Sequence, residues 1–244
     1  MTATPKRSLW PWIVVGVCVA VVLACGGVLW YAVVLAMRTF ASERDRELCE
    51  RQLDQLSVAL EAYDTQNNGY PPAVTKDAAG KPMHSWRALL LPHLGEDLTE
   101  QHAKQEALAK LYDLKQPWDS VGNAKLAPRM PRMLSCPCDP AGWEHQTSYI
   151  GVVDPTTGQL GYLPQGWVSA SVPAGAKIVV IELHESGVMW LEPRDLVPGT
   201  PEAGKILDAA HTAGHYGGTH ILLDDGSVHL LKGAELDTLL EALR

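Results

Sequence analysis

An uncharged apolar run near the N-terminus constrains this chain more than any other feature. Residues 13–37, IVVGVCVAVVLACGGVLWYAVVLAM, contain no charged side chain. As an α-helix this run would extend roughly 37 Å at about 1.5 Å per residue, which is enough to cross a hydrocarbon core about 30 Å thick. We therefore expect a single membrane-spanning helix at residues 13–37, in contact with membrane lipid.

Two kinds of N-terminal processing are alternatives to a retained span. A cleaved signal peptide has a shorter apolar stretch, followed by small residues and a polar mature start, whereas hydrophobicity here continues to Met37. The triplet Val22-Leu23-Ala24 before Cys25 resembles a lipoprotein processing site, but the apolar residues also continue after Cys25. The length of the run favours an uncleaved span.

Basic residues flank the run on both sides and set its orientation only weakly. Lys6 and Arg7 precede the run, and Arg38 begins a mixed-charge segment after it. Because the chain before the run is short and the chain after it has a globular composition, we expect three parts. These are a short cytoplasmic tail at 1–12, the span at 13–37 and an exported domain at 38–244, held in the inner (cytoplasmic) membrane with the domain in the periplasm.

The charge balance limits the classes of partner. The formal net charge is -8 and the sequence pI is about 5.5. A nucleic-acid-binding surface needs clustered Lys and Arg to displace counterions from phosphates, and no such cluster occurs in the sequence. We therefore expect envelope protein partners rather than nucleic acid. The sequence also has no phosphate-binding glycine loop, so we expect no cofactor.

Three cysteines, Cys49, Cys136 and Cys138, lie outside the apolar run. In an exported domain two of them can form a disulfide, which leaves one thiol over. Cys136-Pro137-Cys138 supplies only two of the four ligands that a structural zinc site needs. A disulfide or buried thiols are therefore favoured over a metal site, with the pairing left open.

The segment after the run is typical of an amphipathic helix. An apolar side chain recurs every three or four residues at Cys49, Leu53, Leu56, Leu60 and Tyr63, which forms one stripe along a helix. Because neither Gly nor Pro occurs between Met37 and Asp64, we expect one continuous rod from near Trp12 to about Asn67. Two helices with a break near Arg38 are the alternative.

The rest of the chain indicates shorter helices followed by strands. Helical stretches are expected at 85–91, 98–111 and 233–244. Short runs rich in β-branched and aromatic residues, separated by turn residues, predict antiparallel strands at 147–153, 158–163, 177–183, 187–193, 219–224 and 227–231. A long helix followed by antiparallel strands predicts an α+β domain in which the N-terminal helix packs on the sheet.

Several motifs in this order resemble a planctomycete pilin-like family, similar in organisation to type II secretion pseudopilins. They include LDQLSVALEAYDTQNNGYPP, KPMHSWRALLLPHL, LYDLKQPWDSVGN, SCPCDP and IVVIELHESGVMWLEPRDL, followed by HYGGTHILLDDGSVHLL with its His, nine residues, Asp-Gly motif. The resemblance covers most of the predicted exported domain. It implies a pilin-like fold of unknown function, with a long N-terminal helix packed on an antiparallel sheet.

One departure from that family concerns assembly. Typical relatives resemble prepilins, with a Gly-Phe-Thr-Leu-type cleavage site and a glutamate five residues into the mature chain. The segment KRSLWPWIVVGVCV has neither feature. Since that glutamate is expected to neutralise the N-terminal amine of a neighbouring subunit within the membrane, its absence favours a permanently anchored monomer or accessory protein over a filament subunit.

The C-terminal motif is expected to form a hairpin. If Asp225-Gly226 is a two-residue type I′ loop, Leu223 lies opposite Val228 and Leu222 lies opposite His229. One face of the hairpin is then entirely apolar, which supports this register. His215 would lie at the open end and Asp225 at the tip, so we expect a structural motif rather than a catalytic pair, in which Gly217 and Gly218 let the chain turn into the sheet.

Two metal sites and one enzyme are weaker alternatives. His211 and His215 are four residues apart, as zinc ligands on a helix can be, and Asp224 with Asp225 could contribute to a calcium loop. A metal-dependent hydrolase would use His184, Glu185, His211 and His215. Alternation along 177–185 places Glu182 and His184 on one strand face, where we expect exposed polar side chains, and we therefore predict no catalytic residue.

Overall fold

The first helix of the folded domain carries the predicted apolar stripe. The structure, a computed structural model, describes residues 27, 30–31, 44–95, 100–210 and 217–244, and residues 44–67 are helical. Along this helix Cys49, Leu53, Leu56 and Leu60 are buried and Tyr63 is partly buried, so the predicted stripe is confirmed. The helix ends where Asn68, with φ of 56°, adopts the left-handed conformation typical of helix ends.

The predicted span lies almost wholly outside the described residues. The chain divides into two compact units, Met1–Arg44 and Asp45–Arg244. Within the first unit, residues 27, 30 and 31 are helical. Among the residues that the structure describes, no helix combines the length and the apolar character that a membrane crossing requires. The expected continuity of the rod from Trp12 to residue 43 likewise lies outside them.

Short elements follow the first helix. Strands β1 (Val74–Lys76) and β2 (Pro82–Ser85) form a small antiparallel sheet that the sequence analysis did not predict. Ser85 then caps α2 (Trp86–Leu89) by accepting a hydrogen bond from the Ala88 N–H. Beyond these lie η1 (Leu91–His93), α3 (Glu100–Leu111), α4 (Val121–Ala124), η2 (Ala127–Arg129), η3 (Arg132–Leu134) and η4 (Pro140–Glu144). Of these short elements, only α2 with η1 and α3 fall in stretches that were predicted to be helical.

A four-stranded antiparallel sheet forms the centre of the domain. Its strands lie in the order β3 (Tyr149–Gly151), β4 (Ile178–Glu182), β5 (Gly218–Leu223) and β6 (Val228–Lys232). The predicted strands at 158–163 and 187–193 contribute only isolated bridges, such as Tyr162 with Ile178 and Met189 with Gln146. The domain is therefore α+β with antiparallel sheets, as predicted.

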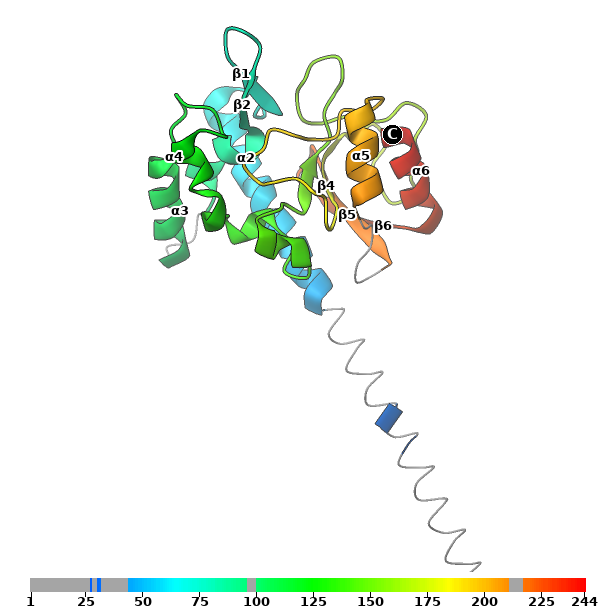
Figure 1. Ribbon diagram of the computed structural model, residues 1–244. Coiled ribbons are helices and arrows are strands. Elements are labelled where there is room, and N and C mark those ends of the chain that lie inside the picture. The colour runs from blue at the N-terminus through cyan, green and yellow to red at the C-terminus, as the bar shows by residue number, and fades with distance from the viewer. Residues whose placement is uncertain (1–26, 28–29, 32–43, 96–99, 211–216) are drawn as a thin grey trace, which may run out of the picture. The chain divides into compact units, whose positions relative to one another are not determined.

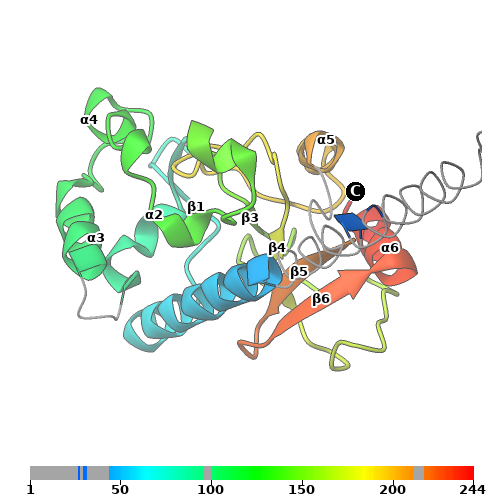
Figure 2. The same cartoon turned by 90° about the horizontal axis from the view of Figure 1, so that it is seen from below.

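Helices cover both faces of this sheet (Figure 1). Val180 and Leu222 share a core with Leu53, Leu56 and Leu60 of the first helix. The opposite face packs on α5 (Pro201–Ala209) and α6 (Gly233–Leu243). Its core contains Ile181, Ile221, Leu223 and Leu231 of the sheet, Ile206 of α5 and Leu239 of α6. Figure 2 shows the first helix alongside β5 and β6 from another direction. Helix α6 was predicted, whereas α5 was not.

The register predicted for the C-terminal hairpin was wrong by one residue. Leu222 pairs with Val228 and Ile221 with His229. The loop has three residues, because the Leu223 N–H donates to the Ser227 carbonyl at 3.0 Å and the Gly226 N–H donates to the Leu223 carbonyl at 3.1 Å. Such a loop usually places a glycine in the left-handed region, and φ of Gly226 is 84°.

The cause of the error is that both faces of β5 are buried. An all-apolar face can identify the register only when the other face of the strand is exposed to solvent. In addition, Asp224 bonds to the start of β4 instead of pairing across the hairpin. Its N–H donates to the Lys177 carbonyl at 3.0 Å, and its Oδ1 accepts from the Lys177 N–H at 2.9 Å.

We predict that Gly226→Val lowers the free energy of unfolding by about 1–3 kcal/mol, because a β-branched residue is strained at this φ. A Cβ at position 226 would also lie 2.9 Å from Ser57 Oγ. The control is Asp225→Asn, which keeps the oxygen that accepts the Ser227 N–H at 2.9 Å and should cost less than about 0.5 kcal/mol. Urea unfolding checks both, and equal stability of the two variants would contradict the prediction.

Candidate functional site

Three buried ionisable side chains meet on the sheet face that the first helix covers. Glu182 Oε2 lies 2.6 Å from His220 Nδ1, and Glu182 Oε1 lies 3.2 Å from His184 Nε2. Glu182 is 4% exposed and His184 is 6% exposed. A carboxylate only accepts hydrogen bonds, so both histidines donate to it. We refer to Glu182, His184 and His220 as the carboxylate–histidine cluster.

The register of the central sheet brings these residues together. Ile181 pairs with Ile221 in the antiparallel β4–β5 pair, so the next residues along, Glu182 and His220, lie opposite each other. Residues two apart along an extended segment point to the same side, which adds His184. The expectation that Glu182 and His184 are exposed was wrong, because the first helix covers this face of the sheet.

A disulfide adjoins the cluster. Cys49 of the first helix is bonded to Cys136, with 5.4 Å between their Cα atoms and a sequence separation of 87. The sulfur atoms and one Glu182 carboxylate oxygen all lie within 4.8 Å of one another. Cys138 is half-buried and lies outside this disulfide. The pairing that the sequence left open is thus Cys49 with Cys136.

A second buried carboxylate, Asp139, holds the SCPCDP segment in place. Its Oδ1 caps η4 by accepting from the Ala141 N–H at 3.0 Å, and its Oδ2 accepts from Ser148 Oγ at 2.7 Å. Ser148 Oγ in turn accepts from the Cys136 N–H at 2.9 Å. Because Ser148 directly precedes β3, this chain of bonds fixes Cys136 against the sheet.

The ionisation of Glu182 follows from its partners. Burial alone would raise its pKa, but the hydrogen bonds from His184 and His220, together with their charges, outweigh burial and lower the pKa from 4.5 to about 2. A carboxyl group with a depressed folded-state pKa stabilises the fold above its unfolded-state value. That contribution is lost as the pH falls from about 4.5 to about 2.

We predict that Glu182→Gln removes this acid-sensitive stability. At pH 7 the variant should be less stable than the parent chain by a few kcal/mol, since each unit of pKa shift corresponds to roughly 1.4 kcal/mol. The difference should shrink towards pH 2, where Glu182 of the parent becomes protonated. Urea unfolding of both proteins between pH 7 and pH 2 measures the difference, and a gap that does not change with pH would contradict the assignment.

The other residues singled out in the sequence fall in separate places. His211 and His215 lie outside the described residues. Glu185 is exposed, and its N–H donates to both Asp139 oxygens at 3.3 Å. Asp225 is exposed and accepts from Ser227 at the hairpin tip, some distance along the strand from His220. The described members of the proposed hydrolase set, His184 and Glu185, therefore differ sharply in burial.

Two glycines of the C-terminal motif lie where the chain enters β5. Gly217 has φ of 64°, and Gly218 begins β5. A Cβ at position 218 would lie 2.6 Å from the Leu231 carbonyl oxygen of β6. Only glycine therefore fits both the turn into the sheet and the close approach of the neighbouring strand.

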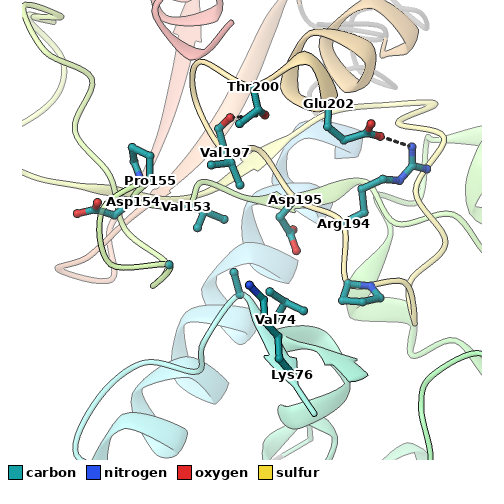
Figure 3. A pocket seen from close by; sticks show the side chains of 13 residues that line it. Val74, Lys76, Val153, Asp154, Pro155, Arg194, Asp195, Val197, Thr200 and Glu202 are labelled. Carbon is teal, nitrogen blue, oxygen red and sulfur yellow. Dashed lines mark hydrogen bonds and ion pairs between the residues drawn. The ribbon is translucent and has the colours of Figure 1, made fainter. Parts of the chain in front are cut away.

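An open cleft of about 370 Å³ lies away from the cluster, between β1, residues 153–158 and residues 193–202 (Figure 3). Lys76 lines the cleft from β1 and Arg194 lines it from the later segment. Arg194 forms ion pairs with Glu192 at 3.1 Å and with Glu202 at 3.2 Å. The cleft thus presents apolar side chains with charged groups at its rim, a combination that suits a ligand or peptide.

A buried ion pair adjoins this cleft, and one of its members, Asp195, lines the cleft. Arg87 Nη1 donates to Asp195 Oδ1 at 2.7 Å, and the Gly151 N–H and Trp86 Nε1 donate to the same oxygen at 2.7 and 3.0 Å. Burial raises the pKa of Asp195, and Arg87, Trp86 and Gly151 offset part of that effect. This pair was not predicted from the sequence. The only signal was a lone cation in the apolar segment WRALLLP.

Comparison with known proteins assigns most of the chain to one protein family. Residues 45–208 match the family described as "Protein of unknown function (DUF1559)". The chain belongs to this family. The matched region includes the first helix, the SCPCDP segment and β4, whereas β5, β6 and α6 follow it. No curated protein and no solved structure matches the chain.

Proposed function

We propose that this chain is a single-pass membrane protein of the cell envelope whose exported domain acts in binding or assembly rather than in catalysis. The Cys49–Cys136 disulfide carries the proposal. Disulfides persist in oxidising compartments and are rare in the cytosol. Cys49 follows the apolar run by only a dozen residues, so the compartment of the disulfide is the compartment of the domain.

The architecture supports the pilin-like part of this proposal. A helix that follows the apolar run packs its apolar stripe on an antiparallel sheet, which is the arrangement that the sequence resemblance implies. The cleft at Lys76 and Arg194 is the surface that we assign to a partner.

Reporter fusions at Arg244 test the topology. We expect alkaline phosphatase fused there to be active, since it folds only after export, and green fluorescent protein to be dark. In the same cells a maleimide polymer should label Cys49 and Cys136 only after reduction. An inactive phosphatase fusion together with a fluorescent partner fusion would place the domain in the cytosol and overturn the proposal.

A photo-crosslinking amino acid tests the binding surface. Placed at Lys76 in the cleft, it should form a discrete adduct with an envelope protein in intact cells. Placed at Lys125, which is exposed and does not line the cleft, it should not. Equal labelling from both positions, or none from either, would contradict a partner site in the cleft.

A further inference from the structure

We propose that Cys49, Cys136 and Glu182 form a zinc site that becomes available when the disulfide is reduced, a property that goes beyond the function proposed above. The three residues come from three separate parts of the fold: the first helix, the segment after η3, and β4. All three are buried. Neither the spacing of the cysteines nor the SCPCDP motif shows this arrangement in the sequence.

The geometry of the ligand atoms carries the inference. The two sulfur atoms and a Glu182 oxygen lie within 4.8 Å of one another. Tetrahedral zinc with Zn–S bonds of about 2.3 Å and Zn–O bonds of about 2.1 Å sets its ligand atoms roughly 3.6–3.8 Å apart. Because their Cα atoms are 5.4 Å apart, the two sulfur atoms can reach that spacing by rotation of the cysteine side chains once the disulfide opens.

The chemistry of the donors favours zinc over other ions. Zinc accepts thiolate, imidazole and carboxylate ligands together, whereas calcium and magnesium require oxygen ligands. His184 and His220 hydrogen-bond to the two oxygens of Glu182, and such partners commonly orient a ligating carboxylate.

The site opens only when a reductant cleaves the disulfide, and the reductant is a dithiol. The dithiol gives two electrons and two protons to the Cys49–Cys136 bond and becomes a disulfide itself, and two thiols form in the domain. Zinc then displaces both thiol protons to solvent and binds the two thiolates and the Glu182 carboxylate, and a water molecule takes the fourth tetrahedral position, so that the site has a net charge of -1. The metal would thereby restore the link between helix and sheet that reduction removes.

Zinc stoichiometry in the full chain tests the proposal. All proteins carry Cys18→Ser and Cys25→Ser. Each is either reduced with a non-chelating phosphine in the absence of oxygen or left oxidised. Zinc is then added, and unbound zinc is removed by desalting. We expect about one zinc per reduced chain and less than about a tenth of that per oxidised chain. The Cys49→Ser/Cys136→Ser variant should bind no stoichiometric zinc, and Cys138→Ser should bind as the parent does.

Two further measurements keep the test decisive. Glu182→Gln should weaken zinc binding at least tenfold against a chromophoric chelator, while cobalt bound to the reduced parent should show thiolate charge-transfer absorption. If the reduced chain unfolds, added zinc should refold it, as circular dichroism would report. A reduced parent that binds no zinc or stays unfolded with it, or binding that depends on Cys138, would overturn the inference. None of these outcomes bears on the topology proposed above.

Discussion

Arg87→Met is expected to lower the free energy of unfolding by about 3–5 kcal/mol. The substitution keeps an apolar stem in place of the aliphatic part of Arg87 but removes the guanidinium group, which leaves the Asp195 carboxylate buried without its cation, the costly outcome for a buried ion pair. It also removes the donors to the carbonyl oxygens of Trp190, Glu192 and Arg194. Denaturant unfolding of the full chain measures the loss.

A matched control is available for this prediction. Arg129 is exposed at the end of η2, so Arg129→Met should change the stability by no more than about 0.5 kcal/mol. Adding Asp195→Asn to Arg87→Met removes the stranded charge and should recover part of the loss. If the unfolding free energy of Arg87→Met were within about 1 kcal/mol of that of the parent, the Arg87–Asp195 pair would not be holding α2 to the segment that contains Asp195.

Leu56→Asp is expected to unfold the domain, at a cost of about 4 kcal/mol or more. Leu56 is fully buried between the first helix and the sheet. The change therefore combines the loss of a core side chain, usually 2–5 kcal/mol on truncation, with the burial of an unpaired carboxylate. Loss of the cooperative transition in near-ultraviolet circular dichroism would report it.

Val58 provides the control on the same helix. Its side chain is 43% exposed, and Val58→Asp should shift the unfolding free energy by less than about 1 kcal/mol. If the apolar run anchors the chain as proposed, both variants should still fractionate with membranes. A Leu56→Asp chain as stable as Val58→Asp would contradict the packing of the stripe.

The buried cluster shows where local reasoning failed. Alternation correctly placed Glu182 and His184 on one face, but whether that face meets water depends on a helix more than a hundred residues earlier in the chain. Their third partner, His220, depends on the pairing of β4 with β5. The face of the sheet that the first helix covers and the strand that pairs with β4 leave no local trace in the sequence around Glu182.

The cysteines illustrate the same limit. Their compartment and their preference for a disulfide over a two-ligand metal motif could be argued from composition and spacing. The pairing of Cys49 with Cys136 could not, because three cysteines allow three pairs and only the packed structure brings two of them together.

The sequence by itself determined the elements whose signals are periodic and local. These are the apolar stripe of the first helix, α3, α6 and the strands β3 to β6, because a side-chain repeat of 3.6 or 2 residues is written directly into the chain. The tertiary structure alone decided that the sheet is covered on both faces. That layering set the register of the hairpin, buried Glu182 beside the disulfide and placed Arg87 on Asp195, because burial and long-range pairing depend on residues that are distant in sequence and close only after folding.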